Sequence, residues 1–440
     1  MRDILIFMLV FGSLPFIVKR PYVGILVWFW LSFMSPHRLS WGFAYDFPFS
    51  AVVAVVLLTS VLLSREPKQM TWSSVTVVWA LFFVLTIITT LMALMPEDAV
   101  MEWSRWWKIN LVSLIVLLIM GQRERLHLLI WVIVLSLGFY GVKGGIFSLT
   151  TGGKYMVIGP PGSFIDDNTN LGLALVMTLP LMRYLQLEAE KSWVKWGLFG
   201  AMGLTSLAII TTQSRGSFLG FAAMAVFLII KSKNWFRIGI VVLALTPILF
   251  SFMPDAWFTK METIQTFEDD GSALGRINAW YFAFNIAVER PIIGGGFGTF
   301  DPKLFLLYAP DPEDFHDAHS IYFEVLGEQG FVGLGLFLLL GILTYRSASW
   351  IIRNTKKHPD LMWANNLAAM IQVSLIGYAI CGAFLGLAYF DFLYVLIAII
   401  VLIRKIVADE LAVTIPQEPI ESQESLNKTL AVRHHARGRS

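Results

Sequence analysis

A few charged side chains interrupt a largely apolar chain, and they lie in the segments that separate its apolar runs. Arg215 lies in a short polar stretch, 211–218, between two such runs. Arg276 and Arg290 bracket a stretch, 275–291, whose apolar residues recur at helical spacing. Arginine binds phosphate oxygens bidentately and keeps its charge. These arginines are therefore candidates for holding an anionic group.

Two histidines precede the apolar run 321–345. His319 would lie at the end of a membrane helix, where an imidazole that titrates near neutrality could take a proton from a hydroxyl group. A structural histidine is the alternative. His316 is three residues away, and this pair with nearby Asp is only a weak metal signal. The chain has one cysteine, Cys381, which lies in an apolar run. A single cysteine excludes a disulfide within the chain and a Cys-based metal site. We expect neither a metal nor a cofactor.

The segment 141–168 is rich in Gly and Pro, which predicts a loop rather than a continuous helix. Backbone N–H groups in glycine turns can bind anions, and Lys143 would add charge. The alternative is an ordinary loop that caps a helix starting near Thr169, with Asp167 or Asn168 as the cap.

The composition predicts the class of protein that must position these residues. The chain has 440 residues, of which 56% are hydrophobic and 15% charged, against roughly 25% charged in soluble domains. Its apolar runs approach the roughly 20 residues that cross a bilayer, and they do not alternate as barrel strands do. We predict an all-α polytopic membrane protein. The net charge of +2 gives no nucleic-acid signal.

Thirteen apolar segments predict 12–13 transmembrane helices, at 4–18, 22–35, 50–64, 72–95, 105–120, 126–142, 169–187, 194–212, 216–232, 236–253, 321–345, 362–387 and 389–405. We divide the chain into five segments: N-terminal helices with the Gly/Pro-rich loop (1–168), central helices (169–253), a catalytic loop (254–320), C-terminal helices (321–408) and a disordered cytoplasmic tail (409–440).

Basic residues predict the orientation, because cytoplasmic connections carry an excess of Lys and Arg. Alternate connections are rich in them, for example Lys19/Arg20, Arg65/Lys68, Arg123/Arg125, Lys191/Lys195 and Lys356/Lys357. The long polar stretch from Met253 to Gly333 then faces outward. Within it, 275–291 predicts an amphipathic helix at the bilayer surface. The glycines that follow lack the G-x-G-x-x-G spacing of a dinucleotide site and predict a tight turn over that helix.

The order of these motifs resembles the O-antigen ligase and polymerase superfamily of bacterial inner membranes. The motifs are Ser214-Arg215-Gly216, then Gly275-Arg276 with Trp280, then Gly294-Gly-Gly-Phe-Gly298, then His319-Ser-Ile-Tyr-Phe-Glu-Val-Leu-Gly-Glu-Gln-Gly-Phe-Val-Gly333. The resemblance covers about Thr169 to Lys405. Two N-terminal stretches, Ser35–Tyr45 and Tyr140–Gly145, are similar to a subgroup called putative O-glycosylation ligases, which is associated with exosortase systems.

The resemblance implies a metal-independent, inverting glycosyltransferase that works in the periplasm. Its donor would be a glycan linked to undecaprenyl diphosphate, and its acceptor a sugar hydroxyl of lipid A–core. By motif, Arg215 and Arg276 match the diphosphate-binding arginines, and His319 matches the catalytic base, with His316 close by. Arg290, Lys143 and His316 are the weaker candidates for substrate binding.

Other functions remain open at this point. A polymerase or a protein O-glycosylation ligase would use the same donor with another acceptor. A transporter of lipid-linked glycan is the alternative from another class, and it should place ionisable groups near the middle of the membrane. A non-catalytic scaffold would leave the outward Arg and His residues unexplained.

Overall fold

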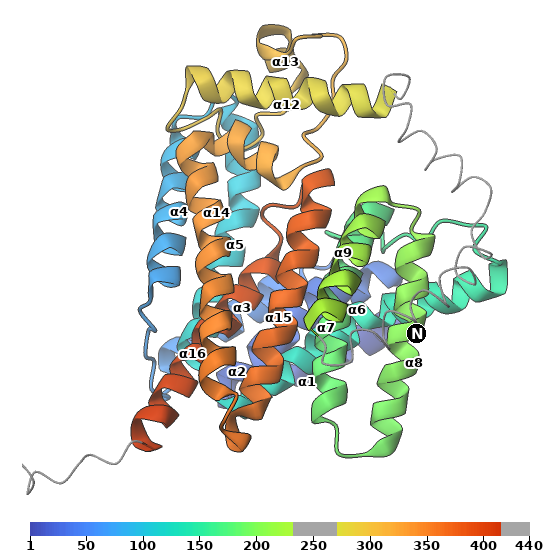
Figure 1. The fold of residues 1–440 in the computed structure, drawn as a ribbon, viewed down its shortest axis with the longest axis vertical. Coiled ribbons are helices and arrows are strands. Elements are labelled where there is room, and N and C mark those ends of the chain that lie inside the picture. Colours follow the sequence, from blue (N-terminus) through green and yellow to red (C-terminus); the bar gives the residue numbers. More distant parts are fainter. Residues whose placement is uncertain (232–270, 415–440) are drawn as a thin grey trace, which may run out of the picture.

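The computed structural model describes residues 1–231 and 271–414, and these residues form helices and no strand (Figure 1). The predicted all-α class is confirmed. The helices are α1 (Arg2–Lys19), α2 (Pro21–Met34), η1 (Pro36–Leu39), α3 (Phe49–Leu63), α4 (Ser74–Leu91), α5 (Pro96–Ile119), α6 (Arg123–Thr151), α7 (Asn168–Glu188), α8 (Ser192–Thr211), α9 (Arg215–Lys231), α12 (Gly271–Glu289), α13 (Pro302–Tyr308), α14 (Ile321–Thr355), η3 (Pro359–Leu361), α15 (Met362–Cys381), η4 (Gly382–Phe384) and α16 (Asp391–Thr414).

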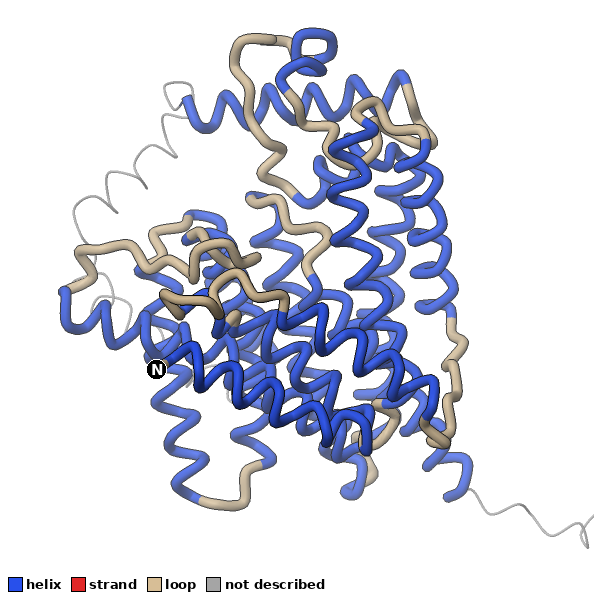
Figure 2. The backbone as a smooth tube through the Cα atoms, turned by 180° about the vertical axis from the view of Figure 1, so that it is seen from behind, coloured by secondary structure: helices blue, strands red, loops and turns tan. Residues whose placement is uncertain are grey.

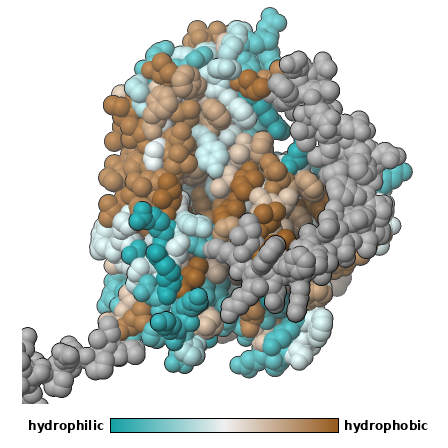
Figure 3. Space-filling model, in the orientation of Figure 1, coloured by the Kyte–Doolittle hydropathy of each residue, from teal (hydrophilic) through white to brown (hydrophobic). Residues whose placement is uncertain are grey.

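The predicted spans coincide with helices wherever the structure describes them, and the predicted span 236–253 lies outside the described residues. Within the described ranges, five helical segments are long and apolar enough to cross a membrane: α4, α6, α8, α14 and the η3–α15–η4 segment, Pro359–Phe384. Shorter apolar helices accompany them at Pro21–Met34, Phe49–Leu63 and Arg215–Ile229. Apolar side chains also cover the outer surface of α4 and α14 between polar ends (Figure 3).

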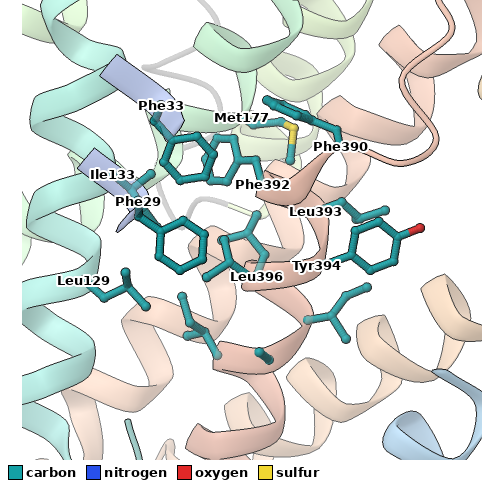
Figure 4. Packing of buried hydrophobic residues seen from close by; sticks show 14 of the residues in the cluster. Phe29, Phe33, Leu129, Ile133, Met177, Phe390, Phe392, Leu393, Tyr394 and Leu396 are labelled. Carbon is teal, nitrogen blue, oxygen red and sulfur yellow. The ribbon is translucent and has the colours of Figure 1, made fainter. Parts of the chain in front are cut away.

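α16 forms the centre of the core. Residues 391–403 are all buried, as expected for a helix that is apolar all round. α16 packs against α5, α14 and α15. At its start, Phe392 lies 5.3 Å from Phe33 of α2 (Figure 4). α1 runs obliquely across the back of the bundle (Figure 2). α16 continues to Thr414, six residues into the predicted tail, and 415–440 lies outside the described residues.

The basic connections meet at one end of the bundle. Arg125 pairs with Glu66 at 2.8 Å, and Arg123 lies 3.7 Å from Glu188. At the opposite end α12 crosses the tips of α4 and α14 (Figure 1). The structure thus separates the two sets of connections that the Lys and Arg pattern distinguished. Which set faces the cytoplasm stays a prediction.

The expectation that 141–168 contains no continuous helix is wrong for 141–151, because α6 runs to Thr151. Its glycines let α6 approach α8 closely. A Cβ at Gly145 would lie 2.2 Å from the carbonyl oxygen of Leu204, and one at Gly141 would lie 2.4 Å from Thr205 Oγ1. Small residues serve this purpose in membrane helices. The loop that follows ends as expected, with the Asp167 side chain accepting from Asn170 N at 2.6 Å.

The predicted amphipathic helix is present as α12, between a small apolar cluster and α14. On one face Phe282 stacks 4.1 Å from Phe305 of α13, and on another Trp280 stacks 4.8 Å from Phe323 of α14. α12 begins at Gly271, so Arg276 lies in its second turn and not at its N-terminus as expected.

Candidate active site

A cavity of about 450 Å³ lies beneath α12, among α5, α14 and the segments around 297–300, 317–319 and 384–389. Its lining is strongly charged. The basic side chains are Arg105, Arg276 and His319, and the acidic ones are Glu102, Asp167, Asp317, Glu324 and Glu328. Residues from distant parts of the sequence thus meet at one end of the bundle.

His319 lines this cavity just before α14. It has φ of 41°, a left-handed conformation that is uncommon for a residue with a side chain. Trp280 Nε1 donates to the carbonyl oxygen of the preceding residue, Ala318, at 2.8 Å, which fixes the chain here. Burial and the nearby Arg276 charge lower the pKa of His319 below its usual 6.5. A neutral imidazole is therefore available to accept a proton.

His316 lies outside the cavity lining. Its Nδ1 is 3.1 Å from Asp314 Oδ1. Its ring packs against the start of α12, where a Cβ at Gly275 would lie 2.4 Å from His316 Cε1. The two histidines, which spacing alone left equivalent, therefore have different surroundings. In the part of the chain that the structure describes, no three His, Cys, Asp or Glu residues are placed to hold a metal ion.

The two arginines predicted to bind diphosphate lie at this end of the bundle. Arg276 lines the cavity. Arg215 is the first residue of α9 and is not among the residues that line the cavity, but the next two residues of α9 lie against residues that do. A Cβ on its neighbour Gly216 would lie 3.0 Å from Phe384, and Ser217 Oγ donates to the carbonyl oxygen of Thr169 at 3.3 Å. Phe384 and Thr169 both line the cavity.

The structure places the weaker candidates Arg290 and Lys143 elsewhere. Arg290 Nη2 donates to the carbonyl oxygen of Met92, the C-cap residue of α4. It thereby joins the end of α12 to α4. Lys143 is exposed on α6. Neither residue lines the cavity.

Sequence reasoning missed two carboxylates of α14 and one arginine of α5. Glu324 accepts from Ala388 N at 3.1 Å, and Glu328 is only 7% exposed. Their spacing of four residues puts both on one helix face, which was the available signal. Arg105 lines the cavity beside Glu102, which it contacts at 3.0 Å. Glu102 and Arg105 are also spaced to share a helix face.

The predicted tight turn is present, and it rests on a break in α14. Gly295 N and Gly296 N donate to the carbonyl oxygens of Gly327 and Glu328, each at 2.8 Å. Leu94 N donates to the carbonyl oxygen of Gly295 at 2.7 Å. α14 can release these carbonyls because Gly330 leaves helical geometry, with φ of 68°. The turn thus ties α4 to α14 next to the cavity.

The geometry combines groups for two tasks. Arginines at one cavity can hold an anion, and a histidine kept neutral can remove a proton. The deep carboxylates can accept hydrogen bonds from a polyhydroxylated ligand.

Two families match parts of the chain. Residues 200–338 match the family described as O-antigen ligase, which includes Arg215, Arg276 and His319. Residues 1–189 match a family of unknown function. No curated protein matches the chain. The superfamily resemblance is confirmed, and the exosortase-associated subgroup is not.

Proposed function

The chain carries an O-antigen ligase domain at residues 200–338, and we therefore propose that it transfers a glycan from undecaprenyl diphosphate to a hydroxyl of lipid A–core. The domain supports glycosyltransferase activity of the ligase or polymerase type in general. The proposal adds this donor, this acceptor and an active site on the periplasmic face of a bacterial inner membrane.

The observation that carries the proposal is the presence of Arg276 and His319 in one cavity. The acceptor hydroxyl oxygen attacks the anomeric carbon of the donor sugar, and its proton passes to His319. The bond from that carbon to the phosphate oxygen breaks on the opposite face, so the configuration inverts. The lipid diphosphate leaves with the electron pair. Arg276, with Arg215 at the start of α9, stabilises its growing negative charge.

The lowered pKa of His319 suits this role. A base must be unprotonated before it acts, and the burial that lowers the pKa of His319 keeps it so at neutral pH. The chain's own arginines neutralise the leaving group in this mechanism, so no step calls for a metal ion.

Reconstitution tests the proposal. Full-length protein in nanodiscs is given undecaprenyl diphosphate carrying a glycan, with lipid A–core, an unfolded acceptor protein or further donor in separate reactions. We expect transfer to lipid A–core, in the presence of excess chelator as well as without it. Transfer only to protein, or only chain elongation, would identify a protein O-glycosylation ligase or a polymerase instead. Movement of donor across the bilayer without transfer would identify a transporter.

A further inference from the structure

A second cavity, of about 500 Å³, adjoins the first. Its walls come from α2, α3, α5, the segment 162–166 and the start of α16. Arg105, Ile109 and Phe164 line both cavities, so the two share a wall on α5. All its wall residues except Asp391 lie within 1–189, the region that matches a family of unknown function.

Asp391 shows that this cavity is suited to a hydroxyl-bearing ligand. The residue is 5% exposed and lines the cavity. Its Oδ2 accepts a hydrogen bond from Ser32 Oγ. Its Oδ1 is buried and has no hydrogen-bond partner among the described residues. A buried carboxylate oxygen without a partner is costly, and it calls for a donor from outside the fold.

The other lining residues indicate which kind of ligand would supply this hydrogen-bond donor. Ser50 and Ser113 supply hydroxyl groups and Lys108 an ammonium group, while Trp28 supplies an aromatic surface. A sugar unit presents hydroxyls on its edge and apolar C–H groups on its faces, so it would use both kinds of wall. An acyl or prenyl chain would leave Asp391 without a hydrogen-bond donor. The volume lies within the roughly 300–1,000 Å³ of small-molecule sites.

We propose that this second cavity is a saccharide-binding subsite, which holds a sugar unit beside the reacting centre. The inference rests on the proposed function and assigns a role to part of the region 1–189. Two substrates could supply the sugar: the glycan of the donor, next to the bond that breaks, or the core oligosaccharide of the acceptor. In both cases a sugar hydroxyl donates to Asp391 Oδ1.

The test compares probes that differ only in the sugar. Undecaprenyl diphosphate with and without a glycan is titrated against full-length protein in nanodiscs, and the KM for lipid A–core is measured separately. Asp391→Asn removes the charge but keeps a side chain of the same shape. Ser50→Phe narrows the cavity from α3. Ser13→Phe adds the same bulk to a half-buried serine of α1 that lines neither cavity.

If the donor supplies the sugar, both cavity variants bind the glycan-bearing probe roughly ten- to a hundredfold more weakly and the glycan-free probe as the wild type does. Asp391→Asn has this effect because the hydrogen bond is no longer made to a charged group, and Ser50→Phe because its ring takes the space of the sugar. If the acceptor supplies it, both probes bind normally and the KM for lipid A–core rises by a similar factor. Ser13→Phe should change neither quantity.

Unchanged values for all three ligands in folded cavity variants would overturn the inference, as would equal weakening of both probes. Thermal unfolding identifies variants that do not fold. If Asp391→Asn does not fold, the binding result for Ser50→Phe decides the test. The wild-type protein separates this inference from the proposed function. Absence of transfer to every acceptor would refute the function, whereas the comparison of the two donor probes, with and without a glycan, needs no turnover.

Discussion

His319 is the residue on which the proposed chemistry depends, and three of its properties agree with that role. It has a left-handed backbone, it lines the cavity, and its pKa is lowered by burial and by Arg276. Strained backbone conformations persist where the surrounding structure enforces them, and they cluster at functional sites. Its neighbour in sequence, His316, lies beside Asp314, outside the cavity lining, and does not share the left-handed backbone.

The pH dependence of transfer should reflect this shift. The base must be neutral, and its pKa lies below 6.5. We therefore expect kcat/KM to rise with pH through a value below 6.5 and to stay level above it, up to the pH at which other groups titrate. A pH series of transfer rates with saturating lipid A–core measures this. An acidic limb centred well above pH 6.5 would contradict His319 as the base.

Arg276 should act mainly on the donor. We expect Arg276→Ala to reduce donor affinity and transfer, with a loss of transition-state stabilisation of roughly 2.7–4 kcal/mol as for single donors to developing oxyanions elsewhere. Arg276→Lys should recover little, because an ammonium group cannot form the bidentate contact. Donor titration and transfer rates measure both effects. Lys143→Ala, an exposed cation on α6 outside the cavity, is the comparison and should behave as wild type.

The sequence indicated Arg276 and His319 through their motifs and missed Glu324, Glu328 and Arg105, for which a shared helix face was the available signal. His319 and Arg276 line one cavity, as expected of residues with a common task. Arg105 carries no motif of its own, since only the packing of α5 brings it to the site. Arg290 looked like a ligand residue by charge, but it bonds to the end of α4.

At the scale of elements, the break in α14 holds the site together. Gly330 has φ of 68°, and a Cβ there would lie 2.7 Å from the carbonyl oxygen of Pro291. The break releases the carbonyl groups to which the glycine turn at 294–296 bonds. The backbone conformation therefore explains why glycine follows Glu328 and Gln329 in this motif, which residue spacing alone did not explain.

We expect Gly330→Ala to destabilise the protein by about 1–3 kcal/mol, because the new side chain meets both backbone strain and a carbonyl oxygen. Gly335→Ala is the matched control, five residues along the same helix with open space around it. It should be neutral or stabilise by roughly 0.5–1 kcal/mol, the usual gain of Ala over Gly in a helix. Thermal unfolding in detergent compares the two. Equal melting temperatures would mean that the turn does not depend on this glycine.

Helix positions were predictable because each apolar run is long enough to show its boundaries. α6 is the exception over 141–151, because its glycines predict a break in the helix. In the structure, Gly141 and Gly145 give α6 room against α8. Glycine can break a helix or allow two helices to pack closely, and the sequence alone does not distinguish these roles because they depend on the neighbouring helix.

At the scale of the whole molecule, the bundle has two chemically different ends. The charged cavity and α12 lie at one end, and the ion pairs of Arg123 and Arg125 lie at the other. An enzyme that uses a lipid-linked donor on one side of a membrane needs this asymmetry. A transporter site would lie near the middle of the bundle instead.

Thiol labelling tests the orientation. A cysteine introduced at Asp311, beside α13, should react with an impermeant reagent outside intact spheroplasts. One introduced at Lys356, at the opposite end, should react only after lysis. The native Cys381 is fully buried, so it should contribute little background. The reverse pattern would place the cavity in the cytoplasm and refute the periplasmic mechanism.

Single-turnover transfer by His319→Ala and His316→Ala, measured beside donor binding in nanodiscs, tests the central claim most directly. General-base catalysis contributes about 10²–10⁴-fold. We predict that His319→Ala loses transfer on that scale and binds donor nearly as the wild type does, while His316→Ala keeps most of its transfer. Near wild-type transfer by His319→Ala would contradict the account, and collapse only in His316→Ala would assign the base to the other histidine.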